Sequence, residues 1–121
     1  MLTPSRSRRV FAYQKPCDMR KQYDSLAALV SEAMFLDCLN GDLFLFVGRT
    51  RTRAKVLYFD GTGMCLFAKR LDRGRFAAPW DGQAEISESE LQLLLEGAEL
   101  IGRMPLSPKR VECSDRKVAF R

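Results

Sequence analysis

Residues 43–80 read LFLFVGRTRTRAKVLYFDGTGMCLFAKRLDRGRFAAPW, and this stretch decides the fold. Its apolar runs are rich in aromatic and β-branched residues and are too short for ordinary helices, which is typical of β-strands. Polar turns that contain glycine separate the runs, the clearest being the Asp-Gly-Thr-Gly turn at 60–63. We therefore predict strands over Leu43–Val47, Ala54–Phe59 and Met64–Ala68, followed by a short fourth strand over Arg75–Ala78.

Pairing these strands in an antiparallel meander would collect positive charge at one end of the sheet. In a meander the first and third turns share one end, and the second turn lies at the other. The second turn carries Asp60, whereas the first and third turns carry or flank most of the cations of the stretch. Because consecutive strands are usually neighbours, we expect one cationic rim that contains Arg49, Arg51, Arg53, Lys69, Arg70, Arg73 and Arg75.

An amphipathic helix is expected before these strands. Asp24 or Ser25 is a suitable N-cap, and apolar residues then recur with the helical period as far as about Leu36. The apolar stripe consists of Leu26, Leu29, Val30, Ala33 and Met34. Such a stripe more often belongs to a core than to a cofactor pocket, so we assign it to the core.

A second amphipathic helix is expected after the strands. Ser87 and Glu90 have the spacing of a capping box, in which each side chain bonds the backbone amide of the other residue. The apolar face that follows consists of Leu91, Leu94, Leu95 and Ala98. Gly97 or Gly102 would end this helix, because glycine adopts the left-handed conformation that is common just past a helix.

These elements predict an α+β fold, an antiparallel β-meander of about four to five strands packed with two amphipathic helices. We expect a further short strand at Val10–Tyr13, and Val118–Phe120 either forms a last strand or stays loose. Several strands are apolar on both faces and need cover from the helices, the N-terminal strand or a second subunit, so a homodimer stays open. We expect a basic arm over 1–9, one α+β domain over 10–100 and a basic tail over 101–121.

Composition excludes several classes of function. The net charge of +5 favours an anionic partner. The chain has no histidine, which excludes Ser-His and Cys-His nucleophiles and any His-ligated metal site. Its 4 cysteines form no CxxC pair, which favours free thiols in a reducing compartment over zinc.

No apolar run approaches the roughly 20 residues of a membrane span, and no secretory signal is evident. We expect a cytoplasmic protein without cofactors or membrane contact.

Two kinds of site compete for the charged residues. Metal-dependent nuclease chemistry needs several acids at one point, and Asp18 with Asp60 or Asp72 could supply them, although the last two are better explained as turn residues. No glycine-rich phosphate loop occurs, so we expect no catalytic residue and no enzyme. The cationic rim is the remaining signal, and Arg20 and Lys21 either join it as phosphate contacts or belong to a local turn.

Several motifs occur in an order that resembles one known family. They are DMRK at 18–21, LAALV at 26–30, GxLFxF at 41–46, RxRxRxK at 49–55, DGxG at 60–63, KRLxRGRF at 69–76 leading to Pro79-Trp80, and LQLLLEG at 91–97. This order resembles the TnpB-type accessory protein, the product of the second open reading frame, of insertion-sequence family sixty-six. Cys17 and Tyr58-Phe59 depart from the family pattern, and the residues after Ile101 carry no recognised motif.

The resemblance implies a small non-catalytic protein of a mobile element that works beside a separate transposase. Together with the cationic rim it supports one main hypothesis, binding of DNA or of a transposase–DNA complex. The alternative is a protein-interaction module in which the rim or an open sheet face holds an acidic segment of the transposase. Trp80 either closes the core or lies exposed near the rim and stacks on a base.

Overall fold

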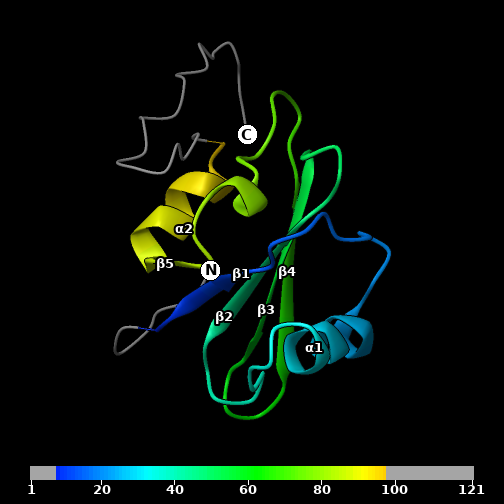
Figure 1. The fold of residues 1–121 in the computed structure, drawn as a ribbon, viewed down its shortest axis with the longest axis vertical. Helices are drawn as coiled ribbons and strands as arrows, with labels where there is room; N and C mark the ends of the chain where they lie inside the picture. Colours follow the sequence, from blue (N-terminus) through cyan, green and yellow to red (C-terminus); the bar gives the residue numbers. More distant parts are fainter. Residues whose placement is uncertain (1–7, 98–121) are drawn as a thin grey trace.

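The computed structural model describes residues 8–97, which form one sheet with a helix on each side (Figure 1). Its elements in chain order are β1 (Val10–Ala12), α1 (Tyr23–Glu32), β2 (Leu43–Val47), β3 (Arg53–Phe59), β4 (Met64–Arg70), the 3-10 helix η1 (Pro79–Asp81), β5 (Glu85–Ile86) and α2 (Glu88–Leu95). The predicted strand at Val118–Phe120, the basic tail and Gly102 lie outside the described residues. The division into arm, domain and tail stays a prediction.

The sheet has five strands in the order β4-β3-β2-β1-β5. The predicted meander is confirmed, because β2, β3 and β4 pair antiparallel, with Phe44 opposite Leu57 and Val56 opposite Phe67. β1 lies parallel to β2, since the chain between them crosses over through α1 before it returns to the sheet. The α+β prediction is therefore correct, and the sheet is mixed although most of its pairs are antiparallel.

The two helices cover opposite faces of the sheet, which explains why the strands are apolar on both sides (Figure 1). On one face, Leu26 and Val30 of α1 pack against a core of Phe11, Cys17, Phe44, Phe46 and Leu57. On the other face, Leu91, Leu94 and Leu95 of α2 pack against Val10, Leu43, Leu45, Val47, Ala54 and Val56. All five residues of β2 are buried between these layers. Among residues 8–97, α1 and α2 cover the two faces of the central strands, so those strands leave no open sheet face of the kind considered from the sequence.

α1 is shorter than its apolar stripe predicts. Its N-cap is Gln22, which makes no side-chain capping bond, so the predicted caps at Asp24 and Ser25 are wrong. The helix ends at Glu32, and Phe35 then adopts a left-handed φ of 58° that turns the chain toward β2. Apolar residues continue at helical spacing past the end of the helix because the residues that follow still contact the core on the α1 side of the sheet.

The predicted fourth strand at Arg75–Ala78 is wrong. The segment has no strand partner. Its backbone bonds run from Phe76 N to Arg51 O at 2.6 Å and from Asp81 N to Ala78 O at 3.1 Å. Its apolar character reflects burial instead, because Phe76 is fully enclosed in the α2-side core. Trp80 is half-buried against the same core, as expected of a core residue.

α2 begins and ends as its sequence predicts. Ser87 Oγ accepts a bond from Glu90 N at 3.0 Å, and Glu90 Oε1 accepts one from Ser87 N at 2.8 Å, which completes the capping box. Gly97 follows the helix with a φ of 97°. These bonds fix where α2 starts and so set its apolar face against the sheet.

Candidate nucleic-acid interface

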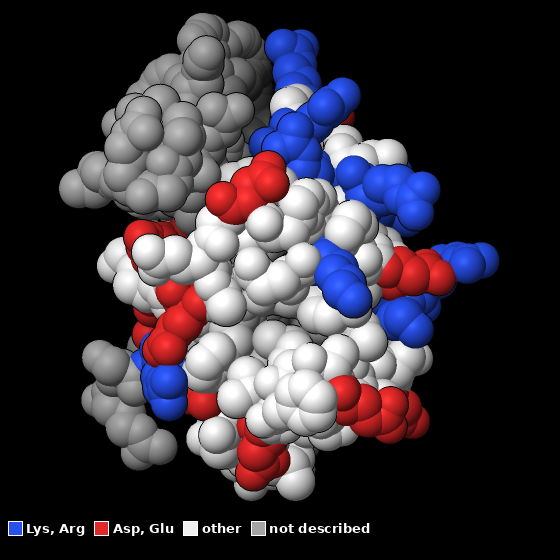
Figure 2. Space-filling view, viewed as in Figure 1, with Lys and Arg blue, Asp and Glu red and all other residues white. Residues whose placement is uncertain are grey.

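The structure brings six predicted arginines to one end of the sheet. The β2–β3 turn and the loop after β4 lie side by side there, joined by bonds from Leu71 N to Thr52 O at 2.8 Å and from Phe76 N to Arg51 O at 2.6 Å. Asp60 lies in the β3–β4 turn at the other end. We define the basic rim as Arg49, Arg51, Arg53, Arg70, Arg73 and Arg75. Figure 2 shows Lys and Arg gathered over the upper and right-hand parts of the molecule in this view.

The rim arginines form no ion pair with any residue between 8 and 97. The three ion pairs in that part of the chain are Arg8–Glu88, Arg9–Glu85 and Arg20–Asp18. Asp72 lies in the loop after β4, yet it is not within salt-bridge distance of a rim guanidinium. The charge of the rim is therefore not neutralised by the described part of the protein, and it is available to an anion.

Arg53 and Arg70 face each other directly across β3 and β4. The flanking bond from Leu71 N to Thr52 O makes theirs a non-hydrogen-bonded pair, the type in which opposed side chains lie closest. Like charges in this position repel each other and destabilise the sheet. An anion between the two guanidinium groups would remove this repulsion, and arginine binds phosphate and carboxylate oxygens bidentately.

Arg51 occupies a strained position at the tip of the β2–β3 turn. Its φ is 61°, a left-handed conformation that a residue with a Cβ adopts at a cost of about 1–2 kcal/mol. A bond from Arg51 N to Gly48 O at 3.0 Å closes the turn, and Phe76 N bonds its carbonyl. Thr50 and Thr52 place their hydroxyl groups 3.0 Å apart beside it.

The DMRK loop, residues 18–21, reaches the rim through the parallel pairing of β1 and β2. Parallel strands end at the same edge of a sheet, so the chain after β1 continues beside the end of β2, where Cys17 N bonds Val47 O at 3.0 Å. Met19 then packs directly on Gly48, where an added Cβ would lie 2.8 Å from Met19 Cγ. The sequence left the position of this loop open because the pairing of β1 could not be predicted.

Asp18 organises the DMRK loop. Its carboxylate accepts bonds from Arg20 N at 2.9 Å, from Arg20 Nε at 3.1 Å and from Arg20 Nη2 at 2.9 Å. The side-chain bond from Arg20 is the main reason that the pKa of Asp18 falls to about 2. Arg20 is thus paired within the loop, although its side chain is 89% exposed.

Two lysines near the rim use their ammonium groups inside the fold. Lys55 is buried and donates to Lys21 O at 2.7 Å, which ties β3 to the DMRK loop. Lys69 donates to Leu95 O at 2.7 Å, where a cation suits the negative end of the α2 dipole. Sequence reasoning missed the role of Lys55, because its place in the pattern of apolar and polar residues along the strand is the same as that of an exposed lysine. Lys21 itself is half-buried and Arg49 is exposed.

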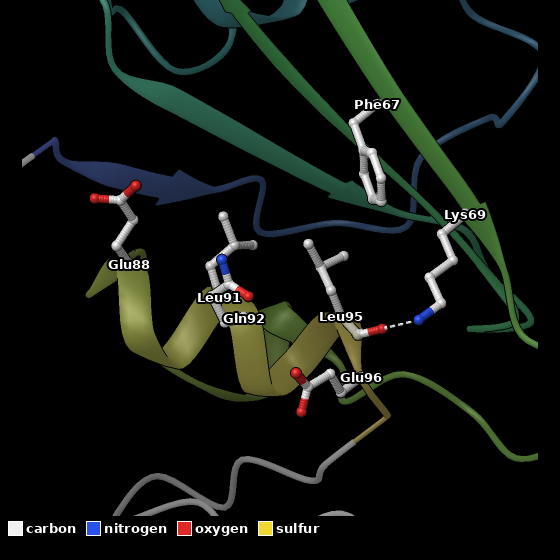
Figure 3. Close-up of a pocket in the computed structure, with 7 residues that line it drawn as sticks. All are labelled: Phe67, Lys69, Glu88, Leu91, Gln92, Leu95 and Glu96. Carbon is white, nitrogen blue, oxygen red and sulfur yellow. Dashed lines mark hydrogen bonds between the residues drawn. The ribbon is translucent and has the colours of Figure 1, made fainter. Parts of the chain in front are cut away.

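A groove lies between α2 and the outermost strand β4 (Figure 3). It has a volume of about 170 Å³ and is lined by Phe67, Lys69, Glu88, Leu91, Gln92, Leu95 and Glu96. Its floor is apolar, and polar residues of α2 follow its outer side. This groove is on the α2 face and is separate from the basic rim arginines.

The carboxylates considered for metal chemistry do not converge. Asp18 lies in the DMRK loop at the rim end, whereas Asp60 lies at the far end and accepts bonds from Thr62 N at 2.9 Å and Gly63 N at 3.0 Å. Between residues 8 and 97 no group of three Asp, Glu or Cys side chains could hold a metal ion. Cys17, Cys38 and Cys65 are free. No helix in the described part of the chain is long and apolar enough to cross a membrane.

Comparison with known proteins identifies the family. The family model described as IS66 Orf2 like protein matches residues 8–104. The chain belongs to the IS66 Orf2-like family. Two relatives from Sinorhizobium fredii (strain NBRC 101917 / NGR234) are similar to this IS66 Orf2-like protein over 101 residues. "Uncharacterized protein y4hO" is 44% identical, with 82% of this chain and 88% of the relative covered. "Uncharacterized protein y4jC" is 37% identical, with 82% and 86% covered.

No solved structure matches this IS66 Orf2-like protein. The resemblance seen in the motifs is confirmed, because the match extends over all of the described residues. Family membership indicates an accessory role in the transposition of an insertion sequence. The DMRK loop and the rim motif KRLxRGRF both lie inside the matched region.

Proposed function

We propose that this IS66 Orf2-like protein is a non-catalytic accessory factor in transposition that binds DNA, or the transposase–DNA complex, through its basic rim. The observation that carries the proposal is the set of six arginines at one end of the sheet without a carboxylate partner among the described residues. Arginines in this number attract a phosphate backbone and release its counterions.

The detail of the rim suits phosphate contacts more than base contacts. The β2–β3 turn is tied to the loop after β4 by the bond from Phe76 N to Arg51 O, which holds the arginines of the two segments near one another. The threonine hydroxyls at 50 and 52 add neutral hydrogen-bond donors of the kind that position a protein on a backbone. Lys21 adds a positive charge along the DMRK loop, whereas Arg20 is paired there with Asp18.

The test is a salt titration of binding to duplex DNA from the ends of the element. In the triple variant Arg49→Gln, Arg53→Gln, Arg73→Gln, affinity at low salt should fall. The slope of log K against log salt should become shallower by about 1 for each phosphate that the variant no longer neutralises. A control variant, Ser31→Glu, Asn40→Asp, Ser89→Glu, changes the net charge equally at exposed positions away from the rim. It should keep most of the affinity and the full slope.

Two results would overturn this proposal. One is the absence of wild-type binding at low salt. The other is an equal loss of affinity in the rim variant and in the control variant, because net charge alone would then explain the binding.

A second candidate is an interaction module that holds an acidic transposase segment without contacting DNA. The Arg53–Arg70 pair favours it equally, since two opposed guanidinium groups bind carboxylates as well as phosphates. Because α1 and α2 cover the faces of the central strands, the rim would carry this contact. Co-purification of the transposase that survives nuclease treatment and is abolished in the triple rim variant would support this candidate.

A further inference from the structure

β4 is the last strand on its side of the sheet, and no described residue pairs with its outer edge. Along β4, the backbone N–H and C=O groups of alternate residues point toward β3 and away from it. The bond from Leu71 N to Thr52 O shows that those of Cys65, Phe67 and Lys69 point toward β3. The groups that point outward belong to Met64, Leu66, Ala68 and Arg70. Proteins usually protect such an edge by keeping it short or by placing proline or charge on it. β4 is 7 residues long and carries charge only at its last two positions.

The side chains of β4 also remain half-covered. β2 is buried along its whole length and β3 has a buried centre, whereas β4 contains no buried residue. Phe67 is half-exposed on the α2 face and lines the groove together with Leu91 and Leu95 (Figure 3). Both the hydrogen-bonding pattern and the apolar surface therefore continue to the edge of the molecule and stop there without a partner in the described chain.

We infer that a second copy of this chain adds its β4 antiparallel to this edge, across a two-fold axis perpendicular to the sheet. Full overlap of the two strands pairs Met64 with Arg70, Leu66 with Ala68, and Phe67 with its own copy. In this register every outward-pointing residue meets an outward-pointing residue of the second copy, so the hydrogen-bond ladder closes. The same surface serves both copies, as a two-fold interface requires.

Charge and packing both favour this antiparallel arrangement. It brings the end of β4 that carries Arg70 against the end of the second copy that leads into the Asp60 turn. A parallel arrangement would set Lys69 and Arg70 against themselves, and like charges in that position repel. The two Phe67 rings become a non-hydrogen-bonded pair on the α2 face, where aromatic side chains make close cross-strand contact beside the groove.

The dimer gives the basic rim a second use. Because the two β4 strands run in opposite directions, the two rims lie at opposite ends of one continuous sheet. If the rim binds DNA, as proposed above, one dimer holds two separate DNA segments. This part of the inference rests on the proposed function, whereas the interface itself does not.

Ala68→Pro tests the interface. Ala68 is exposed and its N–H points away from β3, so proline removes an edge donor without breaking a bond inside the sheet. Sedimentation velocity over a range of concentrations should show a dimer for the wild type and a monomer for Ala68→Pro. Ala68→Thr, a strand-compatible change at the same position, should remain a dimer. Circular dichroism should show the native fold in all three.

A second variant keeps the test decisive if proline disturbs the fold. Phe67→Lys would place two like charges directly across the two-fold axis and should also give a folded monomer. The inference is overturned if the full-length wild type is monomeric throughout the concentration range. It is equally overturned if both folded variants remain dimers.

A bridging assay tests the consequence for DNA. Wild-type protein on a bead-bound duplex should capture a second, fluorescent duplex, whereas Ala68→Pro should bind the first duplex and capture at least tenfold less of the second. A dimer that binds no DNA would refute the proposed function and leave the interface intact. A monomer that binds DNA would refute the interface and leave the proposed function intact.

Discussion

Arg51 combines a structural cost with a charge that the fold does not neutralise. Its φ of 61° would suit glycine, yet the position carries a guanidinium group that forms no ion pair within residues 8–97. Strained residues that the surrounding structure holds in place often mark functional positions. Here the bond from Phe76 N to the Arg51 carbonyl holds the turn in its strained form. Under the proposed function, this arginine serves DNA binding and not the stability of the turn.

Arg51→Gly should separate these two effects. Relief of the left-handed strain contributes about 1–2 kcal/mol, and the entropy of glycine costs about 0.5–1 kcal/mol. The free energy of unfolding should therefore stay level or rise by up to about 1.5 kcal/mol, while DNA affinity falls. Urea denaturation and the salt titration measure the two quantities.

Arg51→Ala is the matched control for this prediction. It removes the same charge but keeps a Cβ in the left-handed conformation, so it should lose DNA affinity without gaining stability. A clear loss of stability in Arg51→Gly would show that the arginine side chain supports the turn, and the explanation by binding would then fail.

At the scale of elements, the meander was predictable and the position of β1 was not. Each meander strand is a short apolar run between turn residues, and the glycine turns fix their antiparallel order. The parallel pairing of β1 with β2 depends on the crossover through α1, which leaves no local signal in the sequence. The DMRK loop consequently could not be assigned to the rim end from its residues alone.

Two element predictions were wrong because buried residues resemble regular structure in sequence. The helical spacing of apolar residues predicted a first helix that continues past Glu32, and the apolar composition of 75–78 predicted a strand. In both segments the apolar side chains contact a core while the backbone is irregular. A pattern of burial therefore reports contact with the core more directly than it reports the backbone conformation.

Gly48→Ala tests how the DMRK loop is seated on β2. The new Cβ would lie 2.8 Å from Met19 Cγ, so Met19 and the loop must shift. Because methionine is flexible, we expect a loss of about 1 kcal/mol, the lower end of the range for overpacking. Thermal unfolding measures the loss, and DNA affinity should fall with it if the loop adds to the positive surface.

Two companion variants make the result specific. Met19→Ala in the Gly48→Ala background restores the space, so the double variant should differ in stability from Met19→Ala alone by less than about 0.5 kcal/mol. Gly63→Ala adds a Cβ that meets nothing within 4 Å and should change stability little. Equal destabilisation by both glycine substitutions would show that contact with Met19 is not the cause.

At the scale of the whole molecule, charge is separated along the sheet. No lysine or arginine occurs between Lys21 and Arg49, so α1 and the connection to β2 contribute acids but no bases. In the meander, the β2–β3 turn and the loop after β4 lie at the same end of the sheet, and both carry arginines. The sequence predicts this convergence because successive turns of an antiparallel meander lie at alternate ends of the sheet. It could not predict which cations the fold uses itself, since the bonds of Lys55, Lys69 and Arg20 depend on tertiary contacts.

This composition predicts DNA binding that is insensitive to pH near neutrality. Histidine is the residue whose ordinary pKa brings its charge change between about pH 5 and 8, and this chain has none. The rim consists of arginines, which stay charged throughout that range. Affinity measured by fluorescence anisotropy at constant ionic strength should therefore change by less than about twofold between about pH 6 and 8, while it falls steeply with added salt. Affinity that falls tenfold as the pH rises would show that a titrating group carries the contact, because the charge of an arginine rim does not change over that interval.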